Sequence, residues 1–273
     1  MPLLHVAVLA ALQGLTEALP VSRSGHGVAA QLWLDPGVAG LPPILHLGTA
    51  LGLVLAARQR LAAALGEGVR AIARPALFRG SPAAHDAVTL LVGTVVSLLV
   101  SAATLPHVEM WAASPTATGA GLCVGGLALA STLLVPRPLG PLRLRATRPG
   151  PSLAAALLVG VAHGLAVFPG ASRVGAALTV LMWIGVRPGR AIDLAFLLTV
   201  PSLLLGFAQQ HAAHGIDAGV IAFGLVLAFL GALIASGALR TLVDRRHLGA
   251  LALWNIPLGL ALLAYAHALP HAI

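Results

Sequence analysis

Long apolar stretches without charged residues dominate the hydrophobic pattern of the chain. A helix must have roughly 18 or more residues to cross about 30 Å of hydrocarbon, so such stretches predict transmembrane helices. Six stretches fit this description: residues 36–57, 87–105, 116–135, 194–210, 218–239 and 248–269. The stretch 87–105 is apolar on all sides, which is typical of a helix embedded in lipid.

Two further apolar regions, residues 1–34 and 152–186, are each interrupted by Pro, Gly, Ser and Arg. Irregular backbone at membrane depth is tolerated where it is buried in protein or lines a cavity. We therefore expect each region to form a re-entrant helical hairpin. Residues 1–12 have no basic segment and no cleavage site, so we expect insertion and not removal as a signal peptide. The predicted fold is an all-α polytopic membrane protein with six transmembrane helices and two re-entrant helical hairpins.

The two interrupted regions resemble each other at an offset of 150 residues. Gly14-Leu15 recurs as Gly164-Leu165, and Ser22-Arg23-x-Gly25 recurs as Ser172-Arg173-x-Gly175. Three predicted spans separate the copies, so they have opposite orientations in the membrane. We predict one integral membrane domain over residues 1–273, with a first repeat at about 1–135 and a second at about 152–269. Inverted repeats usually place the functional site at their interface near the bilayer midplane.

The composition agrees with membrane insertion and adds the topology. Hydrophobic residues make up 58% of the chain and charged residues 9%, against about 25% charged in a soluble domain. All 16 basic residues are arginines, and alternating the spans puts fourteen of them on one face, which we expect to be cytoplasmic. Both termini then lie on the outer side. A nucleic-acid partner would require a clustered basic face, which the pattern does not predict. Cys123 is the only cysteine and forms no internal disulfide.

The two arginines outside the loops, Arg23 and Arg173, lie in the interrupted regions together with Glu17. A charged group at membrane depth is costly and indicates function. Gln13 and Glu17 are four residues apart and project from one helix face, where they could hold Mg²⁺ or Ca²⁺. Glu17 could instead be a general base, or could only neutralise an arginine.

Arginine presents a fork of donors suited to phosphate, and small residues let backbone N–H groups approach an anion. His26 could act as acid, base or nucleophile, or could only bond between helices. His163 stands at the position of Gln13 in the second copy and is expected to line the same cavity. The chain has no ATP-binding motif. Phosphate chemistry on a lipid and transport of an anion both remain open. The expected anion contacts are Ser22, Arg23, Ser24, Gly170 and Ser172.

The pattern resembles a known family at four places between about residues 9 and 201. Gln13-Gly-Leu-Thr-Glu17-x-Leu-Pro-Val-Ser22-x-Ser24-Gly-His26 is similar to the first signature of the BacA-type undecaprenyl-diphosphatases. Pro169-Gly-Ala-Ser-Arg173-x-Gly175 is similar to their second signature, PGxSRSG. Further family-like stretches are Leu45-His46-Leu-Gly48-Thr49 and Phe196-Leu-Leu-x-x-Pro201.

The resemblance implies hydrolysis of undecaprenyl diphosphate to the monophosphate in the bacterial inner membrane, which recycles the lipid carrier for cell-wall synthesis. It implies Mg²⁺ or Ca²⁺ as cofactor, with Glu17 and Gln13 as metal ligands. It also implies catalytic roles for Glu17, His26 and Arg173. The alternative function is that of a polyprenyl-phosphate transporter or flippase with the same fold. The chain could also form a homo-oligomer.

Two positions depart from the family pattern. Arg23 stands where the family usually has a serine implicated in catalysis, and Val174 replaces the second serine of PGxSRSG. Without that first hydroxyl, His26 or a water activated by Glu17 is left as the attacking group. The departures also admit a divergent paralogue that acts on another polyprenyl substrate or hydrolyses none.

Overall fold

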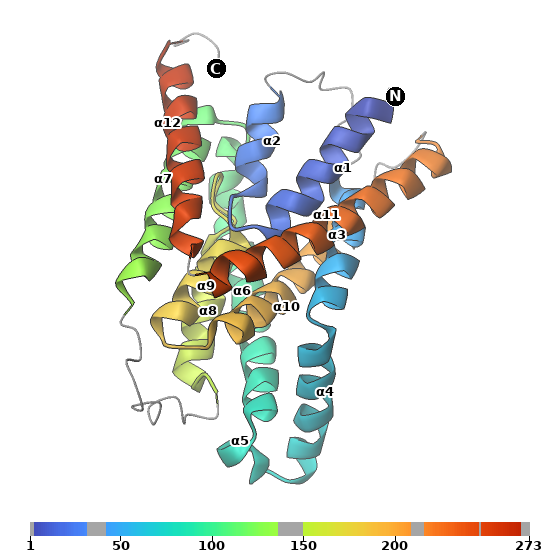
Figure 1. Ribbon diagram of the computed structural model, residues 1–273, viewed down its shortest axis with the longest axis vertical. Helices are drawn as coiled ribbons and strands as arrows, with labels where there is room; N and C mark the ends of the chain where they lie inside the picture. The colour runs from blue at the N-terminus through green and yellow to red at the C-terminus, as the bar shows by residue number, and fades with distance from the viewer. Residues whose placement is uncertain (1–2, 32–41, 136–149, 209–215, 246, 269–273) are drawn as a thin grey trace.

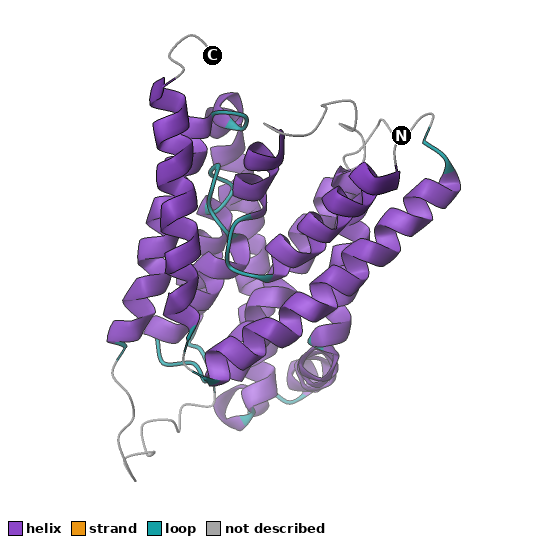
Figure 2. Ribbon diagram, turned by 45° about the horizontal axis from the view of Figure 1, so that its top comes forward, coloured by secondary structure: helices purple, strands orange, loops and turns teal. Residues whose placement is uncertain are grey.

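A computed structural model describes residues 3–31, 42–135, 150–208, 216–245 and 247–268 of the chain. Within these ranges all regular elements are helices, which short loops connect (Figure 2). Five helical segments are long and apolar enough to cross a membrane: Pro82–Trp111, Pro115–Leu134, Pro188–Ala208, Ala218–Asp244 and Leu248–Ala268. The prediction of an all-α polytopic membrane protein is thereby confirmed.

These five segments correspond to five of the six predicted spans. They contain helices α6 (Pro82–Val108), α7 (Pro115–Ser131), α10 (Pro188–Ala208), α11 (Ala218–Asp244) and α12 (Ala252–Ala268). The remaining span, 36–57, holds α3 (Pro42–Ala56), which has 15 residues, while residues 36–41 lie outside the described part. By its described length α3 is one of the shorter apolar helices.

Each interrupted region forms two helices with an irregular break between them. The first region contains α1 (Leu3–Ala18) and α2 (Arg23–Gln31), and the second contains α8 (Leu153–Leu165) and α9 (Arg173–Trp183). The second helix begins in the same way in both regions. Ser22 Oγ accepts the N–H of Gly25 at 3.1 Å, and Ser172 Oγ accepts the N–H of Gly175 at 3.1 Å. A serine cap of this kind satisfies a backbone donor that the first helical turn leaves free.

Glycines let α1 and α8 approach long helices closely. A Cβ atom on Gly14 of α1 would lie 2.2 Å from the carbonyl oxygen of Ala228 in α11. A Cβ atom on Gly164 of α8 would lie 2.7 Å from the carbonyl oxygen of Ser97 in α6. The α1–α11 pair and the α8–α6 pair therefore use the same device at equivalent positions of the two regions.

The segment 58–85 between two predicted spans, whose arginines the topology prediction counts as loop charge, is largely helical, so a loop there is wrong. They form α4 (Arg58–Ala73) and the short α5 (Leu77–Gly80) at the lower end of the molecule in Figure 1. Ala64 and Ala71 are buried, and a Cβ atom on Gly68 would lie 2.9 Å from Ala87 Cβ in α6. Small residues at positions 64, 68 and 71 form one face that packs on α6, so the arginines of this amphipathic helix occupy the other positions.

The buried core surrounds α9 and α10. Leu178 and Leu181 of α9 and Leu194 and Phe196 of α10 are fully buried in one cluster. Since α9 begins directly after the second break, this packing holds that break in the middle of the bundle.

Candidate active site

The two breaks lie side by side near the middle of the bundle (Figure 2). Ser24 Oγ accepts a hydrogen bond of 3.0 Å from the backbone N–H of Gly170. Gly170 has φ +79°, and a Cβ atom there would lie 2.0 Å from the carbonyl oxygen of Thr118. Only glycine fits this position, because it combines a left-handed φ with backbone contact. The Gly170 N–H, expected to bind an anion, bonds to Ser24 in this conformation.

Glu17 is buried at the end of α1 and pairs with the first residue of α2. Its Oε2 lies 3.1 Å from Arg23 Nε and 3.5 Å from Gln13 Nε2. The Glu17 side chain is 8% exposed, whereas that of Arg23 is 41% exposed. The structure therefore brings Gln13, Glu17 and Arg23 together, and the Arg23 charge neutralises the buried carboxylate.

Arg173 opens α9 on the other side of the same site. Within the described residues its guanidinium has neither a hydrogen bond nor a salt bridge, although the side chain is half-buried. It interacts electrostatically with Glu17 and Arg23. One carboxylate and two guanidinium groups give this cluster a net charge of +1. An incompletely neutralised pair of arginines in a partly buried site favours an anion, above all one with the geometry of phosphate.

Both ring nitrogens of His26 have hydrogen-bond partners. Nδ1 lies 2.8 Å from the carbonyl oxygen of Ser22, and Nε2 accepts from the indole N–H of Trp254 in α12 at 2.9 Å. A carbonyl oxygen only accepts and an indole N–H only donates, so Nδ1 carries the proton. His26 can act as base or nucleophile through Nε2 only after Trp254 has moved away.

The three predicted serines hold the backbone of the breaks. Ser22 is fully buried with φ +69°, a strained conformation for a residue with a side chain. Its Oγ caps α2 and lies 3.3 Å from Ser24 Oγ. Ser172 caps α9 in the same manner. Their hydroxyl groups thus position Arg23 and Arg173, each of which directly follows a capping serine.

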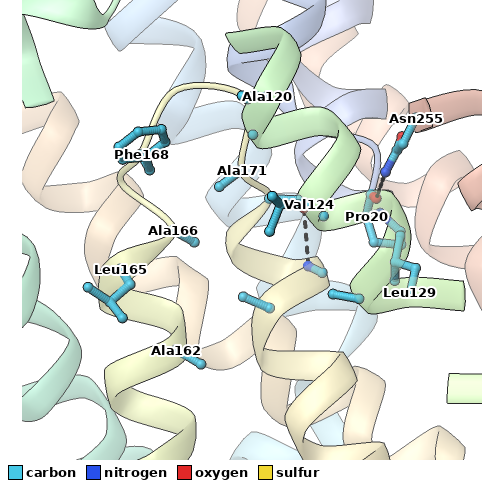
Figure 3. Close-up of a pocket in the computed structure, with 17 residues that line it drawn as sticks. Pro20, Ala120, Val124, Leu129, Ala162, Leu165, Ala166, Phe168, Ala171 and Asn255 are labelled. Atoms are coloured by element: carbon cyan, nitrogen blue, oxygen red, sulfur yellow. Dashed lines mark hydrogen bonds between the residues drawn. The ribbon is translucent and has the colours of Figure 1, made fainter. Parts of the chain in front are cut away.

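A largely apolar cavity of about 420 Å³ borders both breaks. Pro20 of the first break and Gly170 and Ser172 of the second contribute to its wall, as do small and apolar side chains of α7, α8 and α9 (Figure 3). Val124 of α7 is 67% exposed and Leu165 of α8 is 50% exposed, and both line the cavity. The cavity therefore reaches the apolar outer surface between these two helices.

The donor set fits a divalent cation only together with a bound phosphate. Among the described residues no group of three or more His, Cys, Asp or Glu side chains is arranged to hold a metal. Both contacts to Glu17 use Oε2 and not Oε1. Mg²⁺ accepts a single carboxylate oxygen when substrate phosphates and waters complete its shell. Glu17 can contribute such a ligand, and Gln13 lies beside it.

Three residues of this region were not among the predicted site residues. Trp254 bonds to His26, and Asn255 Nδ2 donates to the carbonyl oxygen of Pro20 at 3.0 Å. His46 of α3 is buried, and the charges of the two arginines act on its ring. His46 and Asn255 could have been recognised from the sequence, because each is a polar residue inside a predicted transmembrane span. His163, which was expected to line the cavity, is fully buried and bonds to Ser97 and Thr199 instead.

Comparison with known proteins gives consistent results over nearly the whole chain. The model of the family described as bacitracin resistance protein BacA matches residues 6–261. The chain is 30% identical over 274 residues to a protein of Korarchaeum cryptofilum named undecaprenyl-diphosphatase, covering 97% of this chain and 99% of that protein. It is 32% identical over 285 residues to the undecaprenyl-diphosphatase of Geobacter sulfurreducens, covering 98% of this chain and 100% of that protein.

The family match extends from α1 to α12 and includes both breaks and the arginines that follow them. Together with the five membrane-crossing helical segments, it makes the protein a multi-pass membrane protein. The chain belongs to the BacA family.

Proposed function

We propose that this protein hydrolyses undecaprenyl diphosphate, or a closely related polyprenyl diphosphate, to the monophosphate and inorganic phosphate. The observation that carries the proposal is Arg173, a half-buried guanidinium without a hydrogen-bonding partner among the described residues, beside the Glu17–Arg23 pair. A diphosphate supplies the negative charge and the oxygen acceptors that this site lacks. Membership of a family whose relatives are named undecaprenyl-diphosphatase supports the reaction.

In the proposed reaction Arg173 and Arg23 bind the diphosphate and stabilise the charge that develops on its oxygens. Water attacks the terminal phosphorus, a new P–O bond forms, and the bond to the bridging oxygen breaks. The lipid monophosphate leaves with the electron pair of that bond. Glu17 orients the water, and His26 takes its proton once Trp254 has released Nε2. A bound Mg²⁺ or Ca²⁺ would neutralise part of the diphosphate charge, held by Glu17 with Gln13 beside it.

The cavity between α7, α8 and α9 explains why the substrate is a lipid. It runs from Ser172 at the second break to exposed apolar residues at the protein surface. The isoprenoid units next to the diphosphate would lie in it, and the rest of the tail would extend into the bilayer. Burial of apolar tail surface contributes roughly 25 cal/mol per Å² to binding.

We infer further that the fold has six transmembrane helices and two re-entrant hairpins related by an inverted repeat. The equivalent capping serines and the equivalent glycines of α1 and α8 support this repeat. In Figure 1 α1 begins and α12 ends at the upper end of the molecule, whereas the arginine-bearing α4 lies at the lower end. This arrangement supports both termini on the outer side of a bacterial inner membrane.

The decisive assay measures phosphate release from undecaprenyl diphosphate and farnesyl diphosphate by the purified protein. We expect release from wild type, loss of activity in EDTA, and recovery on addition of Mg²⁺ or Ca²⁺. Activity that persists unchanged in EDTA would remove the cation from the proposal. Absence of phosphate release, together with lipid flipping in proteoliposomes, would replace hydrolysis by transport.

A further inference from the structure

His46 is a buried imidazole without hydrogen bonds. The residue lies on α3 and is 9% exposed, and neither Nδ1 nor Nε2 has a partner among the described residues. A buried polar group left unsatisfied costs about 1–3 kcal/mol. Since both ring nitrogens carry this cost, we expect a bound ligand to supply the hydrogen-bonding groups that His46 lacks.

His46 lies within electrostatic range of the two arginines of the anion site. The charges of Arg23 and Arg173 act on its ring, and these are the charged groups that influence it from α2 and α9. On the α10 side, a Cβ atom on Gly206 would lie 2.9 Å from Nδ1. Glycine at position 206 therefore leaves room for the ring against the backbone of α10.

His163 shows how a purely structural histidine is accommodated in the same protein. It is fully buried, and its ring nitrogens bond to Ser97 Oγ at 2.6 Å and Thr199 Oγ1 at 3.1 Å. His26 is likewise bonded at both nitrogens. Among these three membrane-embedded histidines, His46 alone has no hydrogen bond at either nitrogen within the described structure.

We propose that His46 is a third diphosphate-binding residue, whose ring N–H donates a hydrogen bond to a phosphoryl oxygen between Arg23 and Arg173. This inference rests on the proposed function, because it assumes that the anion of the site is a diphosphate. A neutral imidazole has one N–H donor and one acceptor nitrogen. Phosphoryl oxygens accept the first, and a water molecule donates to the second, so substrate and water together satisfy both buried nitrogens.

The test compares His46→Gln with His46→Leu in two measurements. Gln retains an N–H donor, whereas Leu retains only the apolar bulk. The first measurement is the KM for farnesyl diphosphate. The second is the rise in thermal unfolding temperature on adding methylenediphosphonate, a diphosphate analogue that cannot be hydrolysed. A hydrogen bond to a charged group corresponds to about a 10- to 100-fold change in binding, so we expect His46→Leu to raise KM by that factor and to abolish the thermal shift.

His46→Gln should keep KM within about threefold of wild type and retain the thermal shift, because the donor is preserved. Thr49→Val, one turn along α3, removes a buried hydroxyl that bonds only to the carbonyl oxygen of Leu45, and serves as the control for disturbing this helix. Wild-type binding by His46→Leu would overturn the inference, as would equal losses in His46→Gln and His46→Leu, or in Thr49→Val and His46→Leu.

The two measurements separate this inference from the proposed function. If wild type releases no phosphate but methylenediphosphonate stabilises it through His46, hydrolysis fails and the binding role stands. If wild type hydrolyses the lipid and His46→Leu does so with unchanged KM, the binding role fails and the function stands.

Discussion

Arg23 and Arg173 occupy equivalent positions after capping serines, but their side chains have different environments. Arg23 pairs with Glu17 at 3.1 Å, whereas Arg173 has no hydrogen-bonding partner among the described residues. The first arginine thus contributes to neutralising a buried carboxylate, and the second is available to a ligand. This difference separates the expected consequences of replacing them.

Replacement of Arg173 by alanine should abolish most activity without destabilising the fold. Loss of one group that stabilises transition-state charge typically lowers kcat by about 10²- to 10³-fold. The unfolding temperature should stay near that of wild type, because no described hydrogen bond or ion pair is broken. The measurements are farnesyl diphosphate kinetics and thermal unfolding in detergent. Arg70→Ala, at a side chain that is 73% exposed, is the control and should be silent. Full activity in Arg173→Ala would contradict the site assignment.

Arg23→Ser tests the departure from the family signature. The substitution removes the positive charge beside Glu17 and restores a hydroxyl, so we expect activity to remain within about tenfold of wild type while Arg173 still binds the diphosphate. Glu17 would then be free to attract a cation, and the Mg²⁺ concentration for half-maximal activity should fall. A titration of activity against Mg²⁺ measures this, with Arg70→Ala again as the control. An unchanged or higher Mg²⁺ requirement would argue against Glu17 as a cation ligand.

At the scale of elements, the contact between α1 and α11 depends on one glycine. A Cβ atom on Gly14 would lie 2.2 Å from one backbone atom of α11 and 2.8 Å from another. Backbone cannot be displaced as easily as a flexible side chain, so the helices would have to separate. Glu17 lies one turn after Gly14, and a shift of α1 would therefore also move the carboxylate.

Gly14→Ala should consequently lower both stability and activity. Overpacking of a close contact costs about 1–3 kcal/mol. Gly237→Ala on α11 is the matched control, because nothing lies within 4 Å of a Cβ atom at that glycine. Thermal unfolding in detergent should show a clear decrease for Gly14→Ala and no decrease for Gly237→Ala. Equal stability of the two variants would show that α1 does not pack as described.

At the scale of the whole molecule, a buried network of ion pairs joins four helices. Asp86 of α6 is fully buried and pairs with Arg60 of α4 at 3.0 Å and with Arg190 of α10 at 2.6 Å. Asp193 of α10 also pairs with Arg60, and with Arg240 of α11. Several of the arginines on which the predicted topology is based therefore also form ion pairs between helices.

Asp86→Asn should destabilise the protein strongly, because it removes the charge of the fully buried carboxylate that Arg60 and Arg190 share. Breaking a buried ion pair by removing one partner costs about 3–5 kcal/mol. Glu67→Gln affects an exposed pair with Arg70 and should cost no more than about 1 kcal/mol. The comparison requires unfolding measurements of both variants in the same detergent. A small effect of Asp86→Asn would show that the network contributes little to stability.

The proposed orientation places Met110, just beyond the C-terminal end of α6, on the outer side of the membrane and Arg70 of α4 on the cytoplasmic side. Cysteines at these two positions should therefore react with labels from opposite sides. In a Cys123→Ala background, Met110→Cys should react with a membrane-impermeant maleimide in intact spheroplasts, since Met110 is 80% exposed beyond the outer end of α6. Arg70→Cys, in the exposed face of α4, should react only after permeabilisation. The reverse labelling pattern would show that the protein has the opposite orientation in the membrane.

The hydrophobic pattern alone predicted much of the architecture. Uninterrupted apolar runs identified five membrane-crossing segments, and the sixth predicted span contains α3. Such runs predict helices because a chain that crosses lipid must satisfy its backbone hydrogen bonds internally. Interruptions by Pro, Gly, Ser and Arg identified both breaks and the arginines that follow them. These features are local, since each is determined by residues close together in the chain. The helical fold of residues 58–85 was not predicted, because the segment is rich in arginine and its buried face of small residues is defined by packing against α6.

The assembly of the site was decided by contacts between distant parts of the chain. His26 bonds to Trp254, 228 residues away, and Ser24 bonds to Gly170, 146 residues away. No local pattern shows that His26 is bonded at both nitrogens or that the Gly170 N–H is taken by a hydroxyl. The same holds for His46, whose lack of partners depends on how α3 packs against α1, α10 and α11. The sequence by itself determined which groups are present at membrane depth, and the tertiary structure decided which of them remain free for a ligand, because hydrogen bonding in a buried site depends on the packing of helices from both halves.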